Sequence, residues 1–357
     1  MNRLPLLARG SSLLILILTL ALILPAASHA QAASGVGFSP IEVADPVSGG
    51  KMAGFVFYPA ANANGVTKLG PYELNATAGA DPLPGRKPLI LISHGHGGSD
   101  LGHHDLATYL AARGFIVAAI THPRDNVRDS SGDGQAVVLG GRPRQISATI
   151  SYLLASARWK PLIDRDRIGV AGFSNGGYTA LLLVGARPNF TMLPRHCKLD
   201  PEDRNICGPL AKLEAQAALG HRTIEQIVGA LQRGLSQWGD TRDSRIKAAF
   251  VMAPFSSPFD AAGLAGVHRP LLLYYAANDQ VLLPRFNSLH IAPLIRTLVA
   301  LRKIPRAGHY VFLSPCSTEL ADEAPDICTD PPGTDRVALH RKINADAVRF
   351  FRTHLHD

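Results

Sequence analysis

Short, fully apolar runs alternate with amphipathic stretches over most of the chain. Apart from Arg167 and Lys247 at their starts, the apolar runs lie at residues 88–93, 115–120, 167–171, 247–253 and 270–276, and a stretch near 301–304 continues the alternation. Stretches with helical periodicity lie between them, at residues 105–113, 144–156 and 178–184. Strands that are apolar on both faces belong in a sheet that helices cover on both sides, and such sheets are mostly parallel. The pattern therefore predicts an α/β fold with a mostly parallel central sheet.

Two regions depart from this alternation. Residues 36–43 and 52–58 are β-like runs separated by the turn sequence Pro-Val-Ser-Gly-Gly, which predicts a hairpin at an antiparallel edge of the sheet. Residues 188–241 form a long polar segment with helical periodicity only near 223–235. Because a connection of this length in a compact domain usually serves as a lid or a binding element, we expect a lid or cap insertion at 188–241.

The first thirty residues have the pattern of an export signal. Arg3 and Arg9 precede a run of twelve residues at 13–24 that is apolar except for Thr19, and Ser28-His29-Ala30 fits the small-x-small cleavage rule. A spanning helix needs about 20 apolar residues, so the run is short for one. We therefore expect a signal peptide at 1–30, one domain over 31–357, export to the periplasm or the medium, and no stable membrane insertion after cleavage. An uncleaved N-terminal anchor is the alternative.

The four cysteines fit an oxidising compartment. Cys197 and Cys207 are ten residues apart, and Cys316 and Cys328 are twelve apart, each pair in a polar segment. Four cysteines allow three connectivities, of which two local disulfides, Cys197–Cys207 and Cys316–Cys328, are the simplest. A zinc site is the alternative, but neither pair has C-x-x-C spacing.

The net charge changes this picture little. It is +8, and removal of Arg3 and Arg9 with the signal would leave +6. These charges are scattered along the chain instead of forming runs, which predicts a solvated surface and no nucleic-acid partner.

The stretch GFSNGG, at residues 172–177, carries the first sign of chemistry. It contains G-x-S-x-G directly after an apolar strand and directly before a helix. This turn is so sharp that only small residues fit two positions before and after the serine, and it exposes the serine oxygen at the carboxyl edge of the sheet. The context predicts that Ser174 is a nucleophile, with an ordinary glycine-rich turn as the alternative.

A serine hydroxyl is a weak nucleophile, so it needs a base and a group that orients the base. After a G-x-S-x-G turn of this kind the acid comes next in the chain and the histidine last. Asp279 follows the apolar strand at 270–276, and His309 follows the last strand, with Gly308 expected to let its loop approach closely. These contexts predict Asp279 and His309 as the partners of Ser174, although Asp279 could also be a simple turn residue.

The stretch SHGHGGSDLGHHD, at residues 93–105, holds four histidines and two aspartates. It follows an apolar strand, where a loop commonly supplies one backbone N–H of an oxyanion hole. We assign that N–H to His96 and the second donor to Asn175, the residue after the nucleophile. A metal site would need His94, His96, His103, His104 or Asp105 to converge, and neither H-x-x-x-H nor H-E-x-x-H spacing occurs. We therefore expect no metal, and a helix that begins near His103–Asp105.

With these motifs in hand, the chain resembles α/β-hydrolases of the dienelactone hydrolase and platelet-activating-factor acetylhydrolase-like group. The matching segments are SHGHGG, FIVAAITHP, RPRQISATISYLL, GFSNGG, AANDQVLLP and IPRAGHYVFL. They come in the family's order and extend over residues 36–355. The resemblance implies the α/β-hydrolase fold, a Ser174–Asp279–His309 triad and an oxyanion hole at His96 and Asn175. Dienelactone hydrolases proper use a cysteine nucleophile and are cytoplasmic, and Gln145 stands where an acidic residue is common, which predicts a lost contact there.

These features predict a secreted serine hydrolase that cleaves carboxylic esters through an acyl-enzyme, without a cofactor. Short-chain esters are the expected substrates, and acetylated lipids, lactones and polyester fragments are others. The expected partner is thus a small-molecule or lipid ester, and the sequence indicates no oligomeric state. A peptidase or amidase that uses the same triad is one alternative. A catalytically silent hydrolase fold that acts as an envelope binding protein is another.

Overall fold

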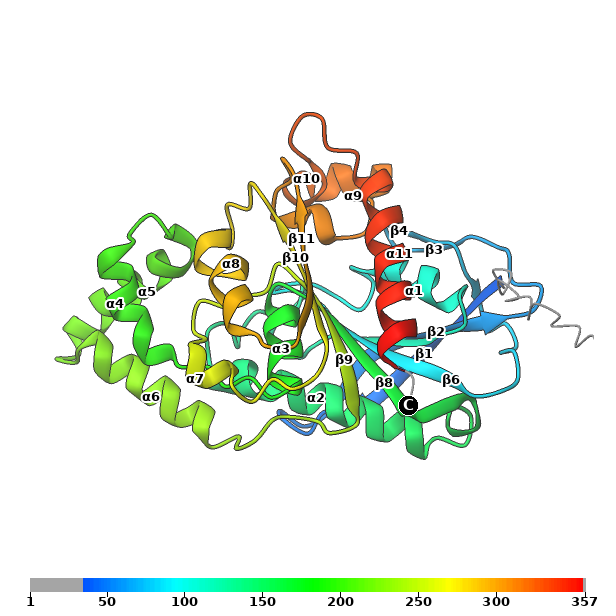
Figure 1. The fold of residues 1–357 in the computed structure, drawn as a ribbon, viewed down its shortest axis with the longest axis horizontal. Helices are drawn as coiled ribbons and strands as arrows, with labels where there is room; N and C mark the ends of the chain where they lie inside the picture. Colours follow the sequence, from blue (N-terminus) through cyan, green and yellow to red (C-terminus); the bar gives the residue numbers. More distant parts are fainter. Residues whose placement is uncertain (1–34, 356–357) are drawn as a thin grey trace, which may run out of the picture. The chain divides into compact units, whose positions relative to one another are not determined.

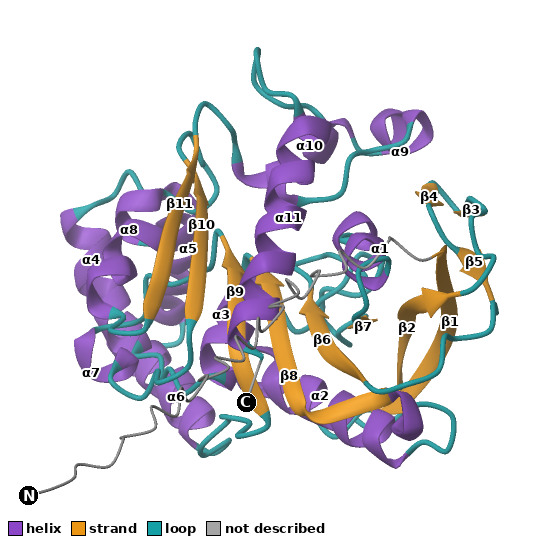
Figure 2. Cartoon of the chain, turned by 45° about the vertical axis from the view of Figure 1, so that its right-hand side comes forward, coloured by secondary structure: helices purple, strands orange, loops and turns teal. Residues whose placement is uncertain are grey.

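A computed structural model describes residues 35–355, so the predicted signal peptide lies outside the described residues. The main sheet has nine strands in the order β11-β10-β9-β8-β6-β7-β2-β1-β5. All neighbouring pairs from β11 to β7 are parallel, and β2 is antiparallel to both β7 and β1. Figure 2 shows this sheet across its width. The strands are β1 (Gly35–Ala44), β2 (Lys51–Ala60), β5 (Thr77–Ala78), β6 (Lys87–Ser93), β7 (Ile116–Ile120), β8 (Ile163–Phe173), β9 (Ile246–Met252), β10 (Leu271–Ala276) and β11 (Leu298–Ile304).

Helices cover both faces of this sheet, as the apolar strands predicted. Helices α1 (His104–Ala111) and α11 (Arg336–His354) pack on one face, and α2 (Ala136–Ala155) and α3 (Asn175–Leu183) pack on the other (Figure 1). In β6, Leu89 and Leu91 belong to the core on the α2 and α3 side. Ile90 and Ile92 belong to the core under α1 and α11. Since every side chain of such a strand is buried, the strand reads as a continuous apolar run.

Two expectations about boundaries need correction. The β1–β2 hairpin lies near one end of the sheet, but the two-residue strand β5 pairs outside β1 and forms the true edge. Helix α2 begins at Ala136, eight residues before the expected start at 144. Its first turns contain Gly140 and Gly141, which are poor helix formers. A Cβ at Gly140 would lie 2.2 Å from Trp238, so the glycine is there to allow close packing.

The 188–241 segment contains more helix than the periodicity indicated. It folds into α4 (Leu193–Leu199), α5 (Arg204–Leu219) and α6 (Ile224–Ser236), which lie together at the left of Figure 1. Helix α6 begins at a capping box between Thr223 and Gln226 and packs against α2. The expected helix near 223–235 is thus confirmed.

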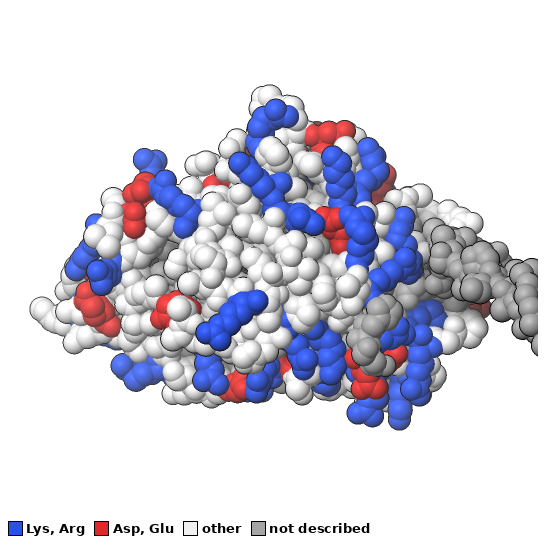
Figure 3. Space-filling view, viewed as in Figure 1, with Lys and Arg blue, Asp and Glu red and all other residues white. Residues whose placement is uncertain are grey.

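The remaining elements are short. They are the β3–β4 hairpin (Thr67–Leu69 and Tyr72–Leu74), α7 (Ala261–Leu264), α8 (Ser288–Ile291), α9 (Thr318–Glu323), α10 (Pro325–Cys328) and five 3-10 turns, of which η5 (His309–Phe312) matters most below. Among residues 35–355, no helix is both long and apolar enough to cross a membrane. Lysines and arginines are spread over the face seen in Figure 3, with acidic residues between them.

Candidate active site

Ser174 stands in a strained turn between β8 and α3. Its backbone angles are φ 55° and ψ −119°, outside the regions that residues other than glycine normally occupy. Its N–H donates to the carbonyl of Met252 at 3.0 Å, and its carbonyl accepts from the N–H of Phe255 at 3.1 Å. Strain of this kind persists only where the surrounding structure enforces it, which is common at functional sites.

The flanking glycines explain why the turn needs its sequence. A Cβ at Gly172 would lie 2.1 Å from the carbonyl oxygen of Gly176. A Cβ at Gly176 would lie 1.8 Å from the carbonyl oxygen of Ser93. No real side chain fits at such distances, so small residues are required on both sides of Ser174, as the motif predicted.

Asp279 and His309 form a direct pair. The Nδ1–H of His309 donates to Oδ2 of Asp279 at 2.6 Å, and both residues are buried. The other carboxylate oxygen of Asp279 accepts from the N–H groups of Val281 and Leu282, at 2.9 and 2.8 Å. These bonds fix the carboxylate in the loop after β10. The close approach expected at Gly308 is not found, because a Cβ there would meet nothing within 4 Å.

The sheet brings Ser174 and this pair to one edge. Ser174 follows β8, Asp279 follows β10 and His309 follows β11, so all three lie at the carboxyl ends of parallel strands. The ring of Phe173, the residue before Ser174, packs on the His309 imidazole with centroids 4.7 Å apart. Within residues 35–355, no hydrogen bond joins Ser174 to His309.

The loop after β6 lies against the same turn. A Cβ at Gly95 would lie 3.2 Å from Cβ of Ser174, so this glycine lets the two backbones approach. The described part of the chain supplies no hydrogen-bond partner for the backbone N–H of His96 or of Asn175. Asn175 is the first residue of α3, where the helix dipole places partial positive charge. The two N–H groups therefore remain free to bind an anion.

The histidines of residues 93–105 do not converge. His94 bonds the carbonyl of Gly95 and the N–H of His122, and His103 bonds the carbonyl of Phe312. Burial lowers the pKa of His94 to about 3 and that of His103 to about 4. Over residues 35–355 there is no group of three or more His, Cys, Asp or Glu side chains arranged to hold a metal ion. These histidines hold the fold around the site.

Gln145, where a lost contact was predicted, makes two hydrogen bonds through its amide. Its Oε1 accepts from Nδ1–H of His122 at 2.7 Å, and its Nε2 donates to Asp45 at 3.1 Å. An amide can both accept and donate, so it joins a neutral histidine to a carboxylate. The pKa of buried His122 lies well below its usual value, mainly because of burial.

Sequence reasoning missed one buried ion pair, between Asp125 and Arg142. Asp125 is 0% exposed at its side chain and Arg142 is 1% exposed, and Nη1 of Arg142 donates to Oδ2 of Asp125 at 2.5 Å. The guanidinium also bonds the carbonyl of His94 and the hydroxyls of Ser93 and Thr179. Burial alone would raise the pKa of Asp125, but Arg142 and a hydrogen bond from His96 hold it well below its usual range.

A second, partly buried carboxylate, Asp105, anchors the segment that carries His309. Asp105 lies in the first turn of α1, as predicted, and its Oδ2 accepts from Nδ1–H of His340 at 2.6 Å and from Asn344 at 2.8 Å. The other oxygen accepts from the hydroxyl of Ser314 at 2.7 Å. His340 also donates from Nε2 to the carbonyl of Val311, within η5, at 2.8 Å. The cluster thus joins α1, α11 and the turn of His309.

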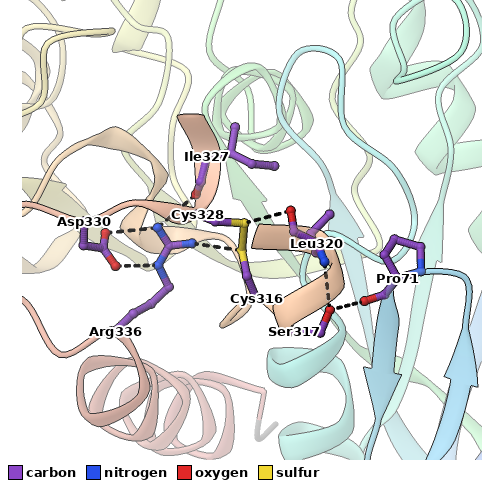
Figure 4. Close-up of a disulfide and its surroundings, with 8 residues drawn as sticks. All are labelled: Pro71, Cys316, Ser317, Leu320, Ile327, Cys328, Asp330 and Arg336. Atoms are coloured by element: carbon purple, nitrogen blue, oxygen red, sulfur yellow. Dashed lines mark hydrogen bonds and ion pairs between the residues drawn. A yellow bond between two sulfur atoms is a disulfide. The ribbon is translucent and has the colours of Figure 1, made fainter. Parts of the chain in front are cut away.

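The cysteines pair as expected, Cys197 with Cys207 and Cys316 with Cys328. Figure 4 shows the second disulfide, which closes the loop that follows η5. Arg336, at the start of α11, makes two hydrogen bonds to Asp330 and one to the carbonyl of Ile327, and its Nη1 lies 3.8 Å from Sγ of Cys316. The loop after His309 is therefore tied to α11.

Comparison with known proteins gives the fold. A ferulic acid esterase from Streptomyces cinnamoneus has a solved structure similar to this chain, with a TM-score of 0.58 over 92% of each chain. The two sequences are 20% identical, so the likeness establishes the α/β fold alone. No family model matches the sequence, and no curated protein matches it. The narrower resemblance to dienelactone hydrolases and platelet-activating-factor acetylhydrolases stays a prediction.

Proposed function

We propose that this protein is a serine hydrolase that cleaves carboxylic esters. The observation that carries the proposal is the strained backbone of Ser174, at the same sheet edge as the buried His309–Asp279 pair. A nucleophile, a base and a group that orients the base are the parts that acyl transfer needs. The fold that the chain shares with a ferulic acid esterase agrees with ester substrates.

In the proposed mechanism, Ser174 Oγ attacks the ester carbonyl carbon while Nε2 of His309 takes its proton. The Asp279 carboxylate holds the imidazole through Nδ1–H and stabilises the imidazolium that forms. His309 then gives the proton to the leaving alcohol, and an acyl-enzyme remains. Water attacks the acyl-enzyme by the same route and releases the acid. Hydrogen bonds between nucleophile and base often form only when substrate is bound.

The backbone N–H groups of His96 and Asn175 would bind the oxyanion of the tetrahedral intermediates. Both lack a partner among residues 35–355, and Asn175 lies at the N-terminus of α3. Donors placed in advance stabilise the charge without reorganisation, and each contributes about 10²–10³-fold to kcat. This chemistry requires no metal and no cofactor.

The 188–241 segment is proposed to shape the substrate site as a lid. Nδ2 of Asn205, in α5, donates to the carbonyl of Gln280 at 2.7 Å, and Arg285 bonds Glu202 at 2.5 Å. The segment thus touches the loop that carries Asp279. Short-chain esters, acetylated lipids and lactones are the proposed substrates, met outside the cytoplasm, where both disulfides are stable.

The test is hydrolysis of p-nitrophenyl esters from C2 to C12 by the wild type and Ser174→Ala. We expect the substitution to lower kcat at least about a thousandfold, because it removes the nucleophile. Ser39→Ala is the matched control, since Ser39 is also buried but lies in β1, near the other end of the sheet, and it should keep full activity.

The outcomes separate the alternatives. A preference for C2–C4 indicates a tight acyl pocket, and a preference for C8–C12 indicates a lipase-like enzyme whose lid is 188–241. Cleavage of p-nitroanilides in place of esters would favour an amidase. Failure of the wild type to hydrolyse any ester and to react at Ser174 with a fluorophosphonate would leave a silent fold and sink the proposal.

A further inference from the structure

One buried carboxylate contacts both loops that carry the proposed oxyanion donors. Oδ1 of Asp125 accepts from Nδ1–H of His96 at 2.6 Å and from the N–H of Gly97 at 3.2 Å. Oδ2 accepts from Nδ2 of Asn175 at 3.2 Å and from Arg142 at 2.5 Å. The loop after β6 and the first residue of α3 thus meet on a single side chain from the loop after β7.

Arg142 bonds the Asp125 carboxylate and also bonds residues at the start of the loop after β6. Its Nη2 donates to the carbonyl of His94 and to the hydroxyl of Ser93, and its Nε donates to Thr179 in α3. Asp125 and Arg142 therefore each contact both the loop after β6 and helix α3. A guanidinium has five N–H donors in a rigid plane, so it fixes several acceptors at once.

Asp125 bonds the side chains of His96 and Asn175 but not the backbone N–H groups that are the proposed oxyanion donors. Asp125 bonds the side chains of His96 and Asn175 and the N–H of Gly97, while the N–H groups of His96 and Asn175 stay unpaired within the described chain. A contact that served only to stabilise the fold would have no need to join these two residues. We propose that Asp125, supported by Arg142, is the positioning residue that sets the spacing and direction of the two oxyanion donors. This rests on the proposed function.

The role follows from how an oxyanion hole works. Its donors must lie within about 3 Å of the place where the oxygen becomes charged, and a small displacement costs much of the stabilisation. The two donors come from separate segments, at residues 96 and 175, so a rigid connection is needed between them. Asp125 supplies that connection from a third segment and never touches the substrate.

The experiment measures kcat and KM for p-nitrophenyl acetate in wild type and Asp125→Asn, together with the affinity of a trifluoromethyl ketone. Ser174 Oγ adds to the ketone carbonyl and its proton passes to His309, so the adduct places an oxyanion in the hole. The matching non-fluorinated ketone, which binds without adding, reports ground-state affinity. An asparagine has the same shape, but its NH2 group replaces one carboxylate oxygen and so faces two of the four donors, which breaks the arrangement.

We expect Asp125→Asn to lower kcat by about 10–100-fold with KM changed less than threefold, and to weaken the trifluoromethyl ketone by a similar factor. Affinity for the plain ketone should stay the same. Two controls should keep activity within twofold. Asp133→Asn removes an exposed carboxylate 3.6 Å from Nδ1 of His96. Asp243→Asn removes the partner of Arg245. Asp243 precedes β9, so it lies at the amino ends of the parallel strands, away from the site at their carboxyl ends.

Unchanged kcat and trifluoromethyl ketone affinity in folded Asp125→Asn would overturn the proposal. A parallel loss in both ketones would also overturn it, since that pattern indicates a damaged pocket. Where Asp125→Asn does not fold, Asn175→Ala takes its place, because it breaks one contact and keeps the backbone donor. We expect a 3–10-fold fall in kcat from it, and no fall would count against the role. If the wild type shows no hydrolysis that depends on Ser174, the proposed function itself is wrong, and the role of Asp125 in positioning the donors falls with it.

Discussion

Asp125 and Asp105 are two carboxylates with similar hydrogen-bond partners, different cations and different burial, since the side chain of Asp125 is 0% exposed and that of Asp105 is 19% exposed. Each accepts hydrogen bonds from a histidine and an asparagine, and each joins segments far apart in the sequence. Asp125 stands beside the proposed nucleophile and Asp105 beside the segment of His309. The cation of Asp125 is Arg142, whereas that of Asp105 is His340.

The different cations give the two clusters a different dependence on pH. An arginine stays charged at any pH that a protein survives, so the Asp125 pair is permanent. Both partners of His340, Asp105 and the carbonyl of Val311, can only accept, which favours the imidazolium with a proton on each ring nitrogen. Burial alone would lower its pKa, but the charge of Asp105 and the hydrogen bond to it raise it above the usual value. The cation that pairs with Asp105 is therefore titratable, whereas Arg142 is not. The Asp125 cluster has a titratable neighbour in His96, whose pKa is raised by its hydrogen bond to Asp125.

The largest expected difference between the two clusters concerns stability, and Arg142→Met tests it. It leaves Asp125 buried without a cation, and removal of one partner of a buried pair costs about 3–5 kcal/mol. We expect a loss of that size in the free energy of unfolding, measured with urea at pH 7. Arg242→Met is the control, because both side chains of its pair with Asp240 are exposed and its loss should cost about 1 kcal/mol or less. Equal losses in the two variants would mean that burial does not distinguish these pairs.

A second effect concerns the loop that follows His309. Replacing Cys316 and Cys328 with serine removes a disulfide over twelve residues, which should lower the free energy of unfolding by about 2–3 kcal/mol. Because this loop is tied to α11 near the Asp105 cluster, we also expect kcat to fall severalfold. The same change at Cys197 and Cys207 lies in the 188–241 segment and should alter acyl-chain preference before it alters kcat on acetate. Identical kinetic effects of the two double variants would contradict this separation.

The smallest expected effect is a dependence of stability on pH from His340. Its folded pKa is raised, so its contribution is complete below the unfolded value of about 6.5 and is lost as pH rises through the folded pKa. Each unit of pKa difference contributes about 1.4 kcal/mol. Urea unfolding of wild type and His340→Gln from pH 6 to 9 should show a stability gap that narrows as pH rises. A gap that is constant over this range would show that His340 is not protonated in the folded protein.

The sheet and the turn at Ser174 could be predicted because their signals are local. Residues 88–93 and 247–253 are apolar on both faces, and the glycines around Ser174 are required by contacts within one strand-turn-helix unit. Asp279 and His309 were identified from the strands before them, and the structure pairs them. What a strand and the residues after it determine is visible in a single sequence.

The two carboxylate clusters could not be predicted in this way. Arg142 lies 17 residues from Asp125, within a stretch of helix that its glycines and proline concealed, and its charge suggested a surface position. Asp105 and His340 are 235 residues apart, and nothing near either residue in the sequence indicates that the two are paired. A charged side chain in the core depends on partners from other elements, and its own neighbours in sequence carry no sign of them.

The 188–241 segment leaves the sheet and returns to it at nearly one point. The N–H of Asp243 donates to the carbonyl of Leu183, the last residue of α3, and residues 186–188 and 239–241 line one small cavity. A piece of chain whose two ends meet can be shortened, lengthened or exchanged without altering the spacing of the strands on either side. The 188–241 segment is thus an insertion that could be exchanged as a unit, and its transfer into a similar sheet should transfer the selectivity proposed for it.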